Sequence, residues 1–490
     1  MSALNKHGLA NLAMLFISKA GGVLVVLLFM PMFYRTLGAA QFGVVAVILS
    51  LQALLVMLDL GMSTMVGREV AVHGTGSPNS AKMWRNAEVI LSVFYLGLLL
   101  LAGLWGVLSS PANLSGFSTA AIVLLFWAMV LQNLGQTVLL GAKSYLAAST
   151  LQLFGALFRA AITLIALQKI AATVPVFIAA QLITTLLQLA LTRWVCVRTL
   201  MVHLPADFHI KFDLTACKAL LKQGKPLLIF GLAGAAVMQL DKPIIAAFIS
   251  AQEVSTYFLA VTFCMTPIAV LAGPVSQYFQ PKLLAVVSQG NSQDAQRLVT
   301  RFAFVLLLVT VLPSASLWFY RDFWVSLWLG DAVNAPQVIL YIAVLLPGVV
   351  IGALGYIPFA MLTAQQDYHF QARLSASMTV IALLAVIYLA AQRNVYTICW
   401  VYAAYHIIST IASWLRSVSL VKTSVYAKDS LYISAKLLLA MTGVGYIVKL
   451  AISLYGGVQY QAAVFSLIML IIGGVAGLIF LKRNMHEIQI

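Results

Sequence analysis

Long apolar runs divide the sequence, and the first two of them set what the chain can fold into. The runs Leu12–Tyr34 and Phe42–Gly67 are separated by the short polar turn Arg35–Gln41. Each run exceeds the roughly 20 residues that a helix needs to cross the hydrocarbon of a bilayer. We therefore expect the chain to begin with a helical hairpin in a membrane.

Further apolar segments follow this hairpin along the whole chain. Charged residues make up only 9% of the sequence, whereas a soluble domain carries about 25%. We place the further spans at 87–108, 117–141, 145–168, 173–197, 225–249, 254–280, 299–320, 336–362, 370–391, 395–418, 432–455 and 460–481. The sequence therefore predicts an all-α polytopic membrane protein with about 14 transmembrane helices.

The positive charges predict the orientation of these spans. Only Arg35, Lys169, Arg321 and Arg393 fall in loops opposite the termini, whereas the loops on the side of the termini hold most of the 29 Lys and Arg residues. Because cytoplasmic loops collect Lys and Arg, both termini are predicted to be cytoplasmic. This bias explains the net charge of +16, and since no basic patch with interleaved aromatic residues occurs, we expect no nucleic-acid partner.

A basic stretch between the sixth and seventh spans predicts the domain organisation. We expect an N-terminal lobe at 1–198, a cytoplasmic linker at 199–224, a C-terminal lobe at 225–422 and two appended helices at 423–490. Within the linker, Asp213–Lys222 has the apolar spacing of an interfacial helix. A faint repeat at an offset of 212, which aligns Gly22 with Gly234 and Pro31 with Pro243, fits two six-helix lobes around a central site.

Charges inside the spans are the first candidates for a site, because a charge in the bilayer normally faces a partner or a wet cavity. Lys19 and Asp59 lie about 24 and 27 Å from the turn that joins their helices, at 1.5 Å per residue. They could form a buried pair, Lys19 could contact substrate, or Asp59 could couple protons. Lys449 lies near the end of an appended helix, where it could bind substrate or extend to the interface.

Arg159, Asp241 and Lys242 lie near the middle of their predicted spans. Asp241 and Lys242 are adjacent, so their side chains should point about 100° apart and not pair with each other. Arg159 could hold a diphosphate with its fork of donors, or it could form a structural salt bridge to Asp241.

Several uncharged groups complete the candidates. His406 is the histidine in the middle of a span, and it could pack or relay protons. Three amides of the fourth span could bind sugar hydroxyls or join helices: Gln132, Asn133 and Gln136. Gly348-x-x-x-Gly352 is interpreted as a helix-packing signal. No spacing indicates a metal, a cofactor or catalytic residues, and the Gly-rich loop 73–80 lacks the Lys and Ser/Thr of a phosphate-binding loop.

Short motifs in order along the chain resemble the polysaccharide transporter (O-antigen flippase) family of the multidrug/oligosaccharidyl-lipid/polysaccharide exporter superfamily. The motifs are RTLGAAQFG at 35–43, LDLG at 58–61, GREV at 67–70, QLDK at 239–242, QPKL at 280–283 and LWLG at 327–330. The resemblance implies a two-lobed, V-shaped bundle. It also implies a flippase that moves undecaprenyl-diphosphate-linked oligosaccharide, such as an O-antigen or exopolysaccharide unit, between the leaflets of the bacterial cytoplasmic membrane by alternating access.

That function would need a cationic cavity for the anionic head of the lipid, for which we expect Lys19, Arg159, Lys242 and Lys449. Lipopolysaccharide synthesis would then bring a glycan polymerase and chain-length machinery as partners. Two rivals share the fold: a flippase for the peptidoglycan lipid precursor and a multidrug/cation antiporter. A membrane glycan polymerase or ligase is the enzyme alternative, and the absence of a large periplasmic loop speaks against it.

Overall fold

The structure, a computed structural model, is helical in the part of the chain that it describes. The described residues are 6–57, 59, 61–108, 116–201, 218, 235–288, 292–330, 334–365, 367–454 and 456–484. Within them there is no strand, and 12 helices are long and apolar enough to cross a membrane. The all-α membrane fold is confirmed. The count of about 14 stays a prediction, because 219–234 and nearly all of the expected interfacial helix Asp213–Lys222 lie outside the described residues.

The chain divides into two compact units, Leu4–Ser255 and Thr256–Ile490, which we call the first and the second unit. The first unit contains α1 (Lys6–Met57), α2 (Met62–His73), α3 (Pro78–Leu108), α4 (Gly116–Gly141), α5 (Tyr145–Lys169), α6 (Val174–Met201) and α8 (Asp241–Phe248). The boundary falls near the start of α9 (Ala251–Ser288). The expected lobe limits stay predictions.

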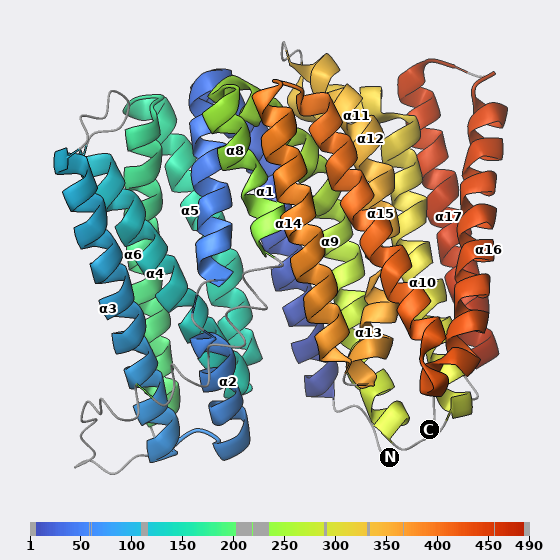
Figure 1. Ribbon diagram of the computed structural model, residues 1–490, viewed down its shortest axis with the longest axis horizontal. Coiled ribbons are helices and arrows are strands. Elements are labelled where there is room, and N and C mark those ends of the chain that lie inside the picture. The colour runs from blue at the N-terminus through green and yellow to red at the C-terminus, as the bar shows by residue number, and fades with distance from the viewer. Residues whose placement is uncertain are drawn as a thin grey trace. The chain divides into compact units, whose positions relative to one another are not determined.

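The predicted opening hairpin lies only partly within α1, because the run Phe42–Gly67 was expected as one span, whereas α1 ends at Met57 and α2 begins at Met62. Element α1 consists of two helices joined at Gly38, whose φ of 75° and ψ of 164° interrupt the helix. Such backbone angles are essentially restricted to glycine, so the turn predicted at Arg35–Gln41 forms where this residue allows it. In Figure 1 the two halves of α1 are separate blue ribbons that meet near the upper edge of the view.

Helix α4 packs against α2, α3 and α6, and α5 lies between α1 and α6. Small residues allow these close contacts. A Cβ on Gly141 of α4 would lie 2.5 Å from the carbonyl oxygen of Gly67 in α2. A Cβ on Gly135 would lie 2.8 Å from the Thr192 methyl group in α6. Small residues at helix contacts are the usual means of close packing in lipid, where the hydrophobic effect does not drive helices together.

The second unit contains most of α9, followed by α10 (Ser292–Phe319), α11 (Arg321–Leu329), α12 (Ala335–Ala353), α13 (Tyr356–Ala364), α14 (Tyr368–Ala391), α15 (Val395–Ser419), α16 (Val421–Ile452) and α17 (Val458–Asn484). Helix α15 packs on α12 and α14, whereas α10 packs on α16 and α17. Tyr320, Phe465 and Met469 belong to the apolar cluster that joins α17 to the end of α10. The two last helices are therefore part of this unit.

The structure differs from the sequence analysis at two elements of the second unit. The span predicted at 336–362 contains a break, because α12 ends at Ala353 and α13 begins at Tyr356. The short helix α11, which begins at Arg321, was not predicted. Apolar composition cannot show a break inside a continuous run. The charged pair Arg321-Asp322 at the start of α11 has the composition of a loop.

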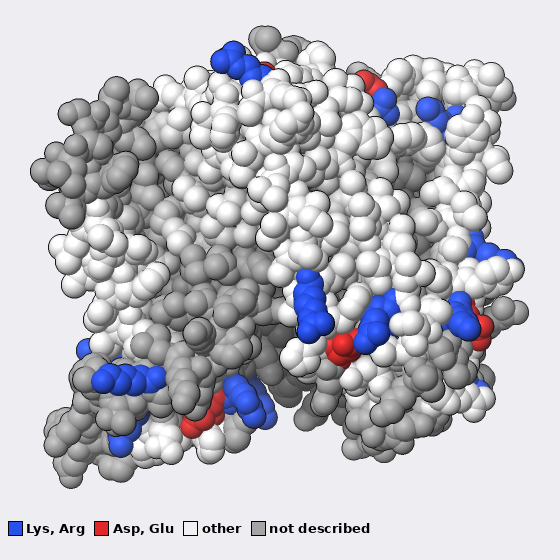
Figure 2. Space-filling view, in the orientation of Figure 1, with Lys and Arg blue, Asp and Glu red and all other residues white. Residues whose placement is uncertain are grey.

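The predicted packing role of Gly348-x-x-x-Gly352 is confirmed. A Cβ on Gly348 would lie 2.6 Å from the Cα of Ala403 in α15, and one on Gly352 would lie 2.5 Å from Nδ1 of His406. Figure 2 shows that most of the described surface on this face belongs to residues other than Lys, Arg, Asp and Glu. A surface with few charged side chains suits a bilayer, where a charge is costly.

Candidate substrate-binding site

Of the two charged residues of the opening hairpin, the structure describes the side-chain contacts of Asp59 but not those of Lys19. Lys19 lies in α1, but its side chain is outside the described part of the structure. Asp59 lies just before α2, and its carboxylate accepts hydrogen bonds from the backbone N–H groups of Gly61, at 2.9 Å, and Ser63, at 3.1 Å. Its carboxylate therefore satisfies amides at the start of α2, which would otherwise lack partners. The expected pair with Lys19 stays a prediction.

The expectation that Asp241 and Lys242 do not pair is wrong. Lys242 Nζ lies 2.9 Å from Asp241 Oδ1, and the two residues are only 2% and 1% exposed. The argument from helix geometry fails because the pair lies at the very start of α8. The lysine side chain folds back toward the preceding turn, where Nζ also donates to the Met238 carbonyl at 2.6 Å. Lys242 is thus buried and neutralised by its neighbour.

Arg159 lies in α5 and is partly buried. Its Nη1 donates to Thr185 Oγ1 of α6 at 3.4 Å, and it forms no salt bridge within the described residues. The alternative of a salt bridge to Asp241 is therefore not what the structure shows. Arg159 keeps a full positive charge, since a guanidinium is not deprotonated in proteins.

Arg159 belongs to a series of polar contacts along the seam between α5 and α6. One turn away in one direction, Gln181 Nε2 donates to Thr163 Oγ1 at 3.2 Å. In the other direction, Gln188 Nε2 donates to the Leu151 carbonyl at 2.9 Å. The α6 members Gln181, Thr185 and Gln188 follow a helical spacing of four and three residues, which puts them on one face. This face is the signal in the sequence that could have identified the seam.

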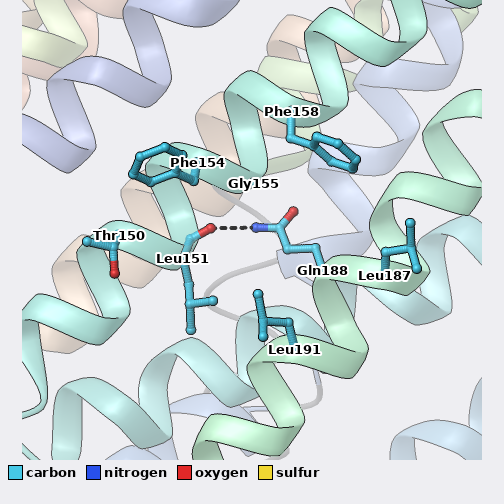
Figure 3. A pocket seen from close by; sticks show the side chains of 8 residues that line it. All are labelled: Thr150, Leu151, Phe154, Gly155, Phe158, Leu187, Gln188 and Leu191. Carbon is cyan, nitrogen blue, oxygen red and sulfur yellow. Dashed lines mark hydrogen bonds between the residues drawn. The ribbon is translucent and has the colours of Figure 1, made fainter.

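A pocket of about 480 Å³ opens along the same seam. Figure 3 shows its lining residues, with the Gln188 amide bonded to Leu151 in the centre. The remaining lining side chains are mostly apolar: Thr150, Phe154, Phe158, Leu187 and Leu191, with Gly155.

Arg159 lies next to this pocket along the chain and along the seam. It follows Phe158 in α5, and its partner Thr185 comes one turn before Gln188 in α6. The Phe154 side chain is 69% exposed, so the pocket is at the surface of the first unit. The seam therefore combines an apolar groove with a fixed cation about one turn, or 5.4 Å, further along the helices.

Gly155 makes room for the centre of this arrangement. A Cβ at this position would lie 1.8 Å from Nε2 and 2.5 Å from Oε1 of Gln188. The amide is thus held against the backbone of α5, and its Oε1 is buried without a hydrogen-bond partner among the described residues. Neither Gly155 nor the pocket was identified from the sequence.

The three predicted amides of α4 lie in helix contacts. Asn133 Nδ2 donates to Ser63 Oγ of α2 at 3.3 Å, and Gln136 Nε2 donates to the Ala148 carbonyl of α5 at 3.2 Å. Gln132 is 9% exposed. For Asn133 and Gln136 the structure therefore shows the helix-joining alternative, while a contact with sugar stays a prediction.

Two remaining candidates lie in the second unit. Lys449 is in the last turn of α16, with Nζ 5.0 Å from the centre of the Phe319 ring. This is a cation–π contact, and both alternatives for Lys449 stay predictions. His406 lies in α15 against Gly352 of α12. No group of three His, Cys, Asp or Glu that could hold a metal occurs in the described ranges.

Comparisons with known proteins agree with this fold. Residues 9–281 match the model of a family described as polysaccharide biosynthesis protein. The solved structure of the lipid II flippase MurJ in an inward closed conformation is 12% identical, with a TM-score of 0.74, covering 97% of this chain and 100% of that one.

Other solved transporters are similar at lower scores. An inward-facing multidrug resistance MATE family transporter of the MOP superfamily is 15% identical, with a TM-score of 0.60, covering 86% of this chain and 94% of that one. A MOP superfamily transporter from Pyrococcus furiosus is also 15% identical, with a TM-score of 0.56, covering 83% and 94%. No curated protein matches the sequence. The expected fold, shared with these transporters, is confirmed.

Proposed function

Because the chain belongs to the polysaccharide biosynthesis protein family, whose model matches residues 9–281, we propose that it flips a lipid-linked oligosaccharide. The substrate would be an undecaprenyl-diphosphate-linked unit of O-antigen or exopolysaccharide, moved from the cytoplasmic to the periplasmic leaflet by alternating access. The protein would act as a transporter, not an enzyme, in the bacterial cytoplasmic membrane.

The observation that carries this proposal is the charge of Arg159. Its guanidinium lies in the middle of a membrane-spanning helix, donates to a neutral hydroxyl, and has no acidic partner among the described residues. A charge in the bilayer is costly, and its retention without a counter-charge is explained if the counter-charge arrives with the substrate. A diphosphate suits this role, because arginine presents a planar fork of donors to phosphate oxygens.

The groove beside Arg159 supports the same substrate class. Its apolar walls and its exposed Phe154 suit a hydrocarbon chain, and the adjacent cation suits an anionic head. An amphiphile with a diphosphate head satisfies both features at once. Lys242 and Lys449 contribute less to this proposal than expected, since the first is neutralised by Asp241 and the second contacts Phe319. Lys19 stays a candidate.

Substitution of Arg159 tests the proposal. In a strain that lacks the chromosomal gene, we expect Arg159→Ala to reduce surface glycan by about tenfold or more, the effect of losing a charge-assisted hydrogen bond. Arg159→Lys should restore only part of the activity, because a lysine lacks the bidentate fork. The amount of protein in the membrane is measured by immunoblot in each strain.

The matched control is Arg373→Ala, which removes an exposed arginine of α14 and should leave glycan display unchanged. The lipid-linked oligosaccharide is extracted from each strain at the same time. We expect it to accumulate in the inner membrane of the Arg159→Ala strain. Full glycan display by a correctly inserted Arg159→Ala protein would exclude the diphosphate contact.

A second candidate function is transport of the peptidoglycan lipid precursor. The likeness to the lipid II flippase, with a TM-score of 0.74 over 97% of this chain, supports it, and its substrate carries the same diphosphate. Deletion of the gene separates the two candidates. Accumulation of an oligosaccharide intermediate in viable cells supports the first, whereas accumulation of the peptidoglycan precursor with lysis supports the second. Accumulation of neither would favour a multidrug antiporter.

A further inference from the structure

Two arginines meet at one end of the first unit, where α3 begins and α6 ends. These two helices lie side by side in Figure 1, and the Gly76 N–H, just before α3, donates to the Leu200 carbonyl of α6 at 3.2 Å. Arg85 belongs to the third turn of α3, and Arg193 lies in the last three turns of α6. The charge bias of the loops predicts that this end faces the cytoplasm.

The two guanidinium groups converge on a single carboxylate oxygen. Glu88 of α3 is only 7% exposed. Its Oε2 accepts from Arg85 Nη1 at 3.2 Å and from Arg193 Nη2 at 3.3 Å, while its Oε1 accepts from Arg193 Nε at 3.1 Å. One buried carboxylate therefore fixes both arginines. Since no other described carboxylate forms a salt bridge with either of them, the trio keeps one positive charge.

Glu88 leaves most of the hydrogen-bond donors of this trio unused. It occupies one N–H of Arg85 and two of Arg193, and an arginine side chain has several more. The Arg85 and Arg193 side chains are 46% and 50% exposed, so the remaining donors reach the surface of the unit. A guanidinium group binds phosphate oxygens through parallel pairs of such donors. Because both groups contact the same oxygen, they lie close enough together to bind one phosphate between them.

Exposed apolar side chains continue from this trio along α3. Val93, Leu96 and Leu100 are exposed, and their spacing of three and four residues puts them on one face of the helix. On α6, the exposed Trp194 follows the arginine directly, and the Arg198 guanidinium lies 4.0 Å from the centre of its ring. Tryptophan and arginine are typical of the level at which the headgroups of a bilayer meet its hydrocarbon. The trio therefore lies where an apolar helix surface ends and charged residues begin.

We propose that Arg85 and Arg193 bind the phosphate of an anionic phospholipid of the cytoplasmic leaflet. The phosphate oxygens accept from the unused donors of both arginines, and an acyl chain lies along the exposed apolar face of α3. Basic sites between membrane helices on the cytoplasmic side suit such lipid head groups. A lipid with one negative charge neutralises the trio, whereas a zwitterionic lipid brings a second cation to it. The inference does not rest on the proposed function, because this lipid stays in the bilayer and is not the transported molecule.

Lipid titrations followed by native mass spectrometry of the purified protein test the site. We expect Arg85→Gln/Glu88→Gln/Arg193→Gln to bind phosphatidylglycerol about tenfold more weakly than wild type, because two basic contacts are lost. The triple change leaves none of the three charges unpaired. The matched control is Arg68→Gln, which changes an exposed arginine of α2, lowers the net charge by the same amount and should bind as wild type does. Equal phosphatidylglycerol binding by the triple variant and the control would overturn the proposal.

A cross-linking measurement on the wild-type protein covers the case in which the triple variant does not fold. Phosphatidylglycerol with a photoreactive diazirine in one acyl chain should label residues 93–101 of α3, and unlabelled phosphatidylglycerol should compete while phosphatidylcholine should not. Competition by phosphatidylcholine to the same extent, or labelling only elsewhere, would overturn the proposal. Stronger competition by a polyprenyl diphosphate would overturn the assignment to a bilayer lipid. Arg159→Ala should leave the labelling unchanged, so failure of the transport function and failure of the lipid site can be told apart.

Discussion

Gly155 shows how one missing side chain positions the groove in the first unit. The Gln188 amide occupies the space that a Cβ would fill, and its bond to the Leu151 carbonyl joins α6 to α5. Polar hydrogen bonds of this kind contribute about 0.6 kcal/mol each to helix association in membranes. This bond holds α6 against α5, and Arg159 donates to Thr185 between the same two helices.

We expect Gly155→Ala to destabilise the protein by about 1–3 kcal/mol, because the added methyl group displaces a buried amide from its partner. Thermal unfolding of the purified protein in detergent measures this loss. Gly97→Ala is the matched control, since a Cβ at that helical position meets nothing within 4 Å. The double variant Gly155→Ala/Gln188→Ala should recover part of the stability. Equal stability of Gly155→Ala and Gly97→Ala would show that the amide can move freely.

The sequence identified the unusual charged residues more reliably than it identified the residues with which they pair. Arg159, Asp241 and Lys242 could be identified as unusual because they interrupt apolar runs. Their pairing could not be predicted, since it depends on where α8 begins and on how far a flexible lysine folds back. The groove was missed for a related reason: it is made by two helices, and the polar face of α6 does not by itself show which helix it packs against.

At the scale of elements, apolar length predicted the membrane-spanning helices, and glycine determines where they bend. The break at Leu354 and Gly355 lies inside a continuous apolar run and left no trace in composition. The turn at Gly38, by contrast, follows the polar residue Arg35 and was predicted. The break between Met57 and Met62 was not predicted although Asp59 lies in it, because this one charge stands in an otherwise apolar run.

The opening hairpin gives a test at this scale. Gly38→Ala should reduce stability by about 1–3 kcal/mol through backbone strain, because φ is 75° and ψ is 164° there and this region is essentially restricted to glycine. No atom lies within 4 Å of the added Cβ, so the cost is conformational. The measurement is unfolding in detergent. Gly22→Ala, in open space inside the same element, should be neutral or stabilising by about 0.5–1 kcal/mol.

At the scale of the whole molecule, the fold followed from the order of apolar segments and motifs, while the transport site did not. Two compact units contain all the described helices. Short motifs spread along the chain indicated the polysaccharide family, and the family match over residues 9–281 confirms it. Among the proposed substrate contacts, the Lys19 side chain lies outside the described part of the structure. The lipid that is carried is identified by deletion of the gene, because both candidate lipids have the diphosphate that is proposed to bind Arg159.

The orientation of the molecule is a prediction from charge bias that fusion proteins can check. Alkaline phosphatase fused after Ile490 should be inactive, and a green fluorescent protein at the same position should fluoresce, because both termini are expected in the cytoplasm. Phosphatase inserted after Ile170, in the turn between α5 and α6, should be active. An active phosphatase at the C-terminus would reverse the assignment of every loop.

The contrast between Arg159 and the Asp241–Lys242 pair has a consequence for energetics in a living cell. A unit charge that moves across the full membrane potential changes in energy by about 2.3 kcal/mol per 100 mV, whereas a neutral ion pair carries no net charge for the field to act on. Arg159 has no counter-charge among the described residues. In the proposed function, the electric field across the bilayer would act on the empty protein through this guanidinium, and a bound diphosphate diester, with two negative charges, would reverse the sign of the charge there.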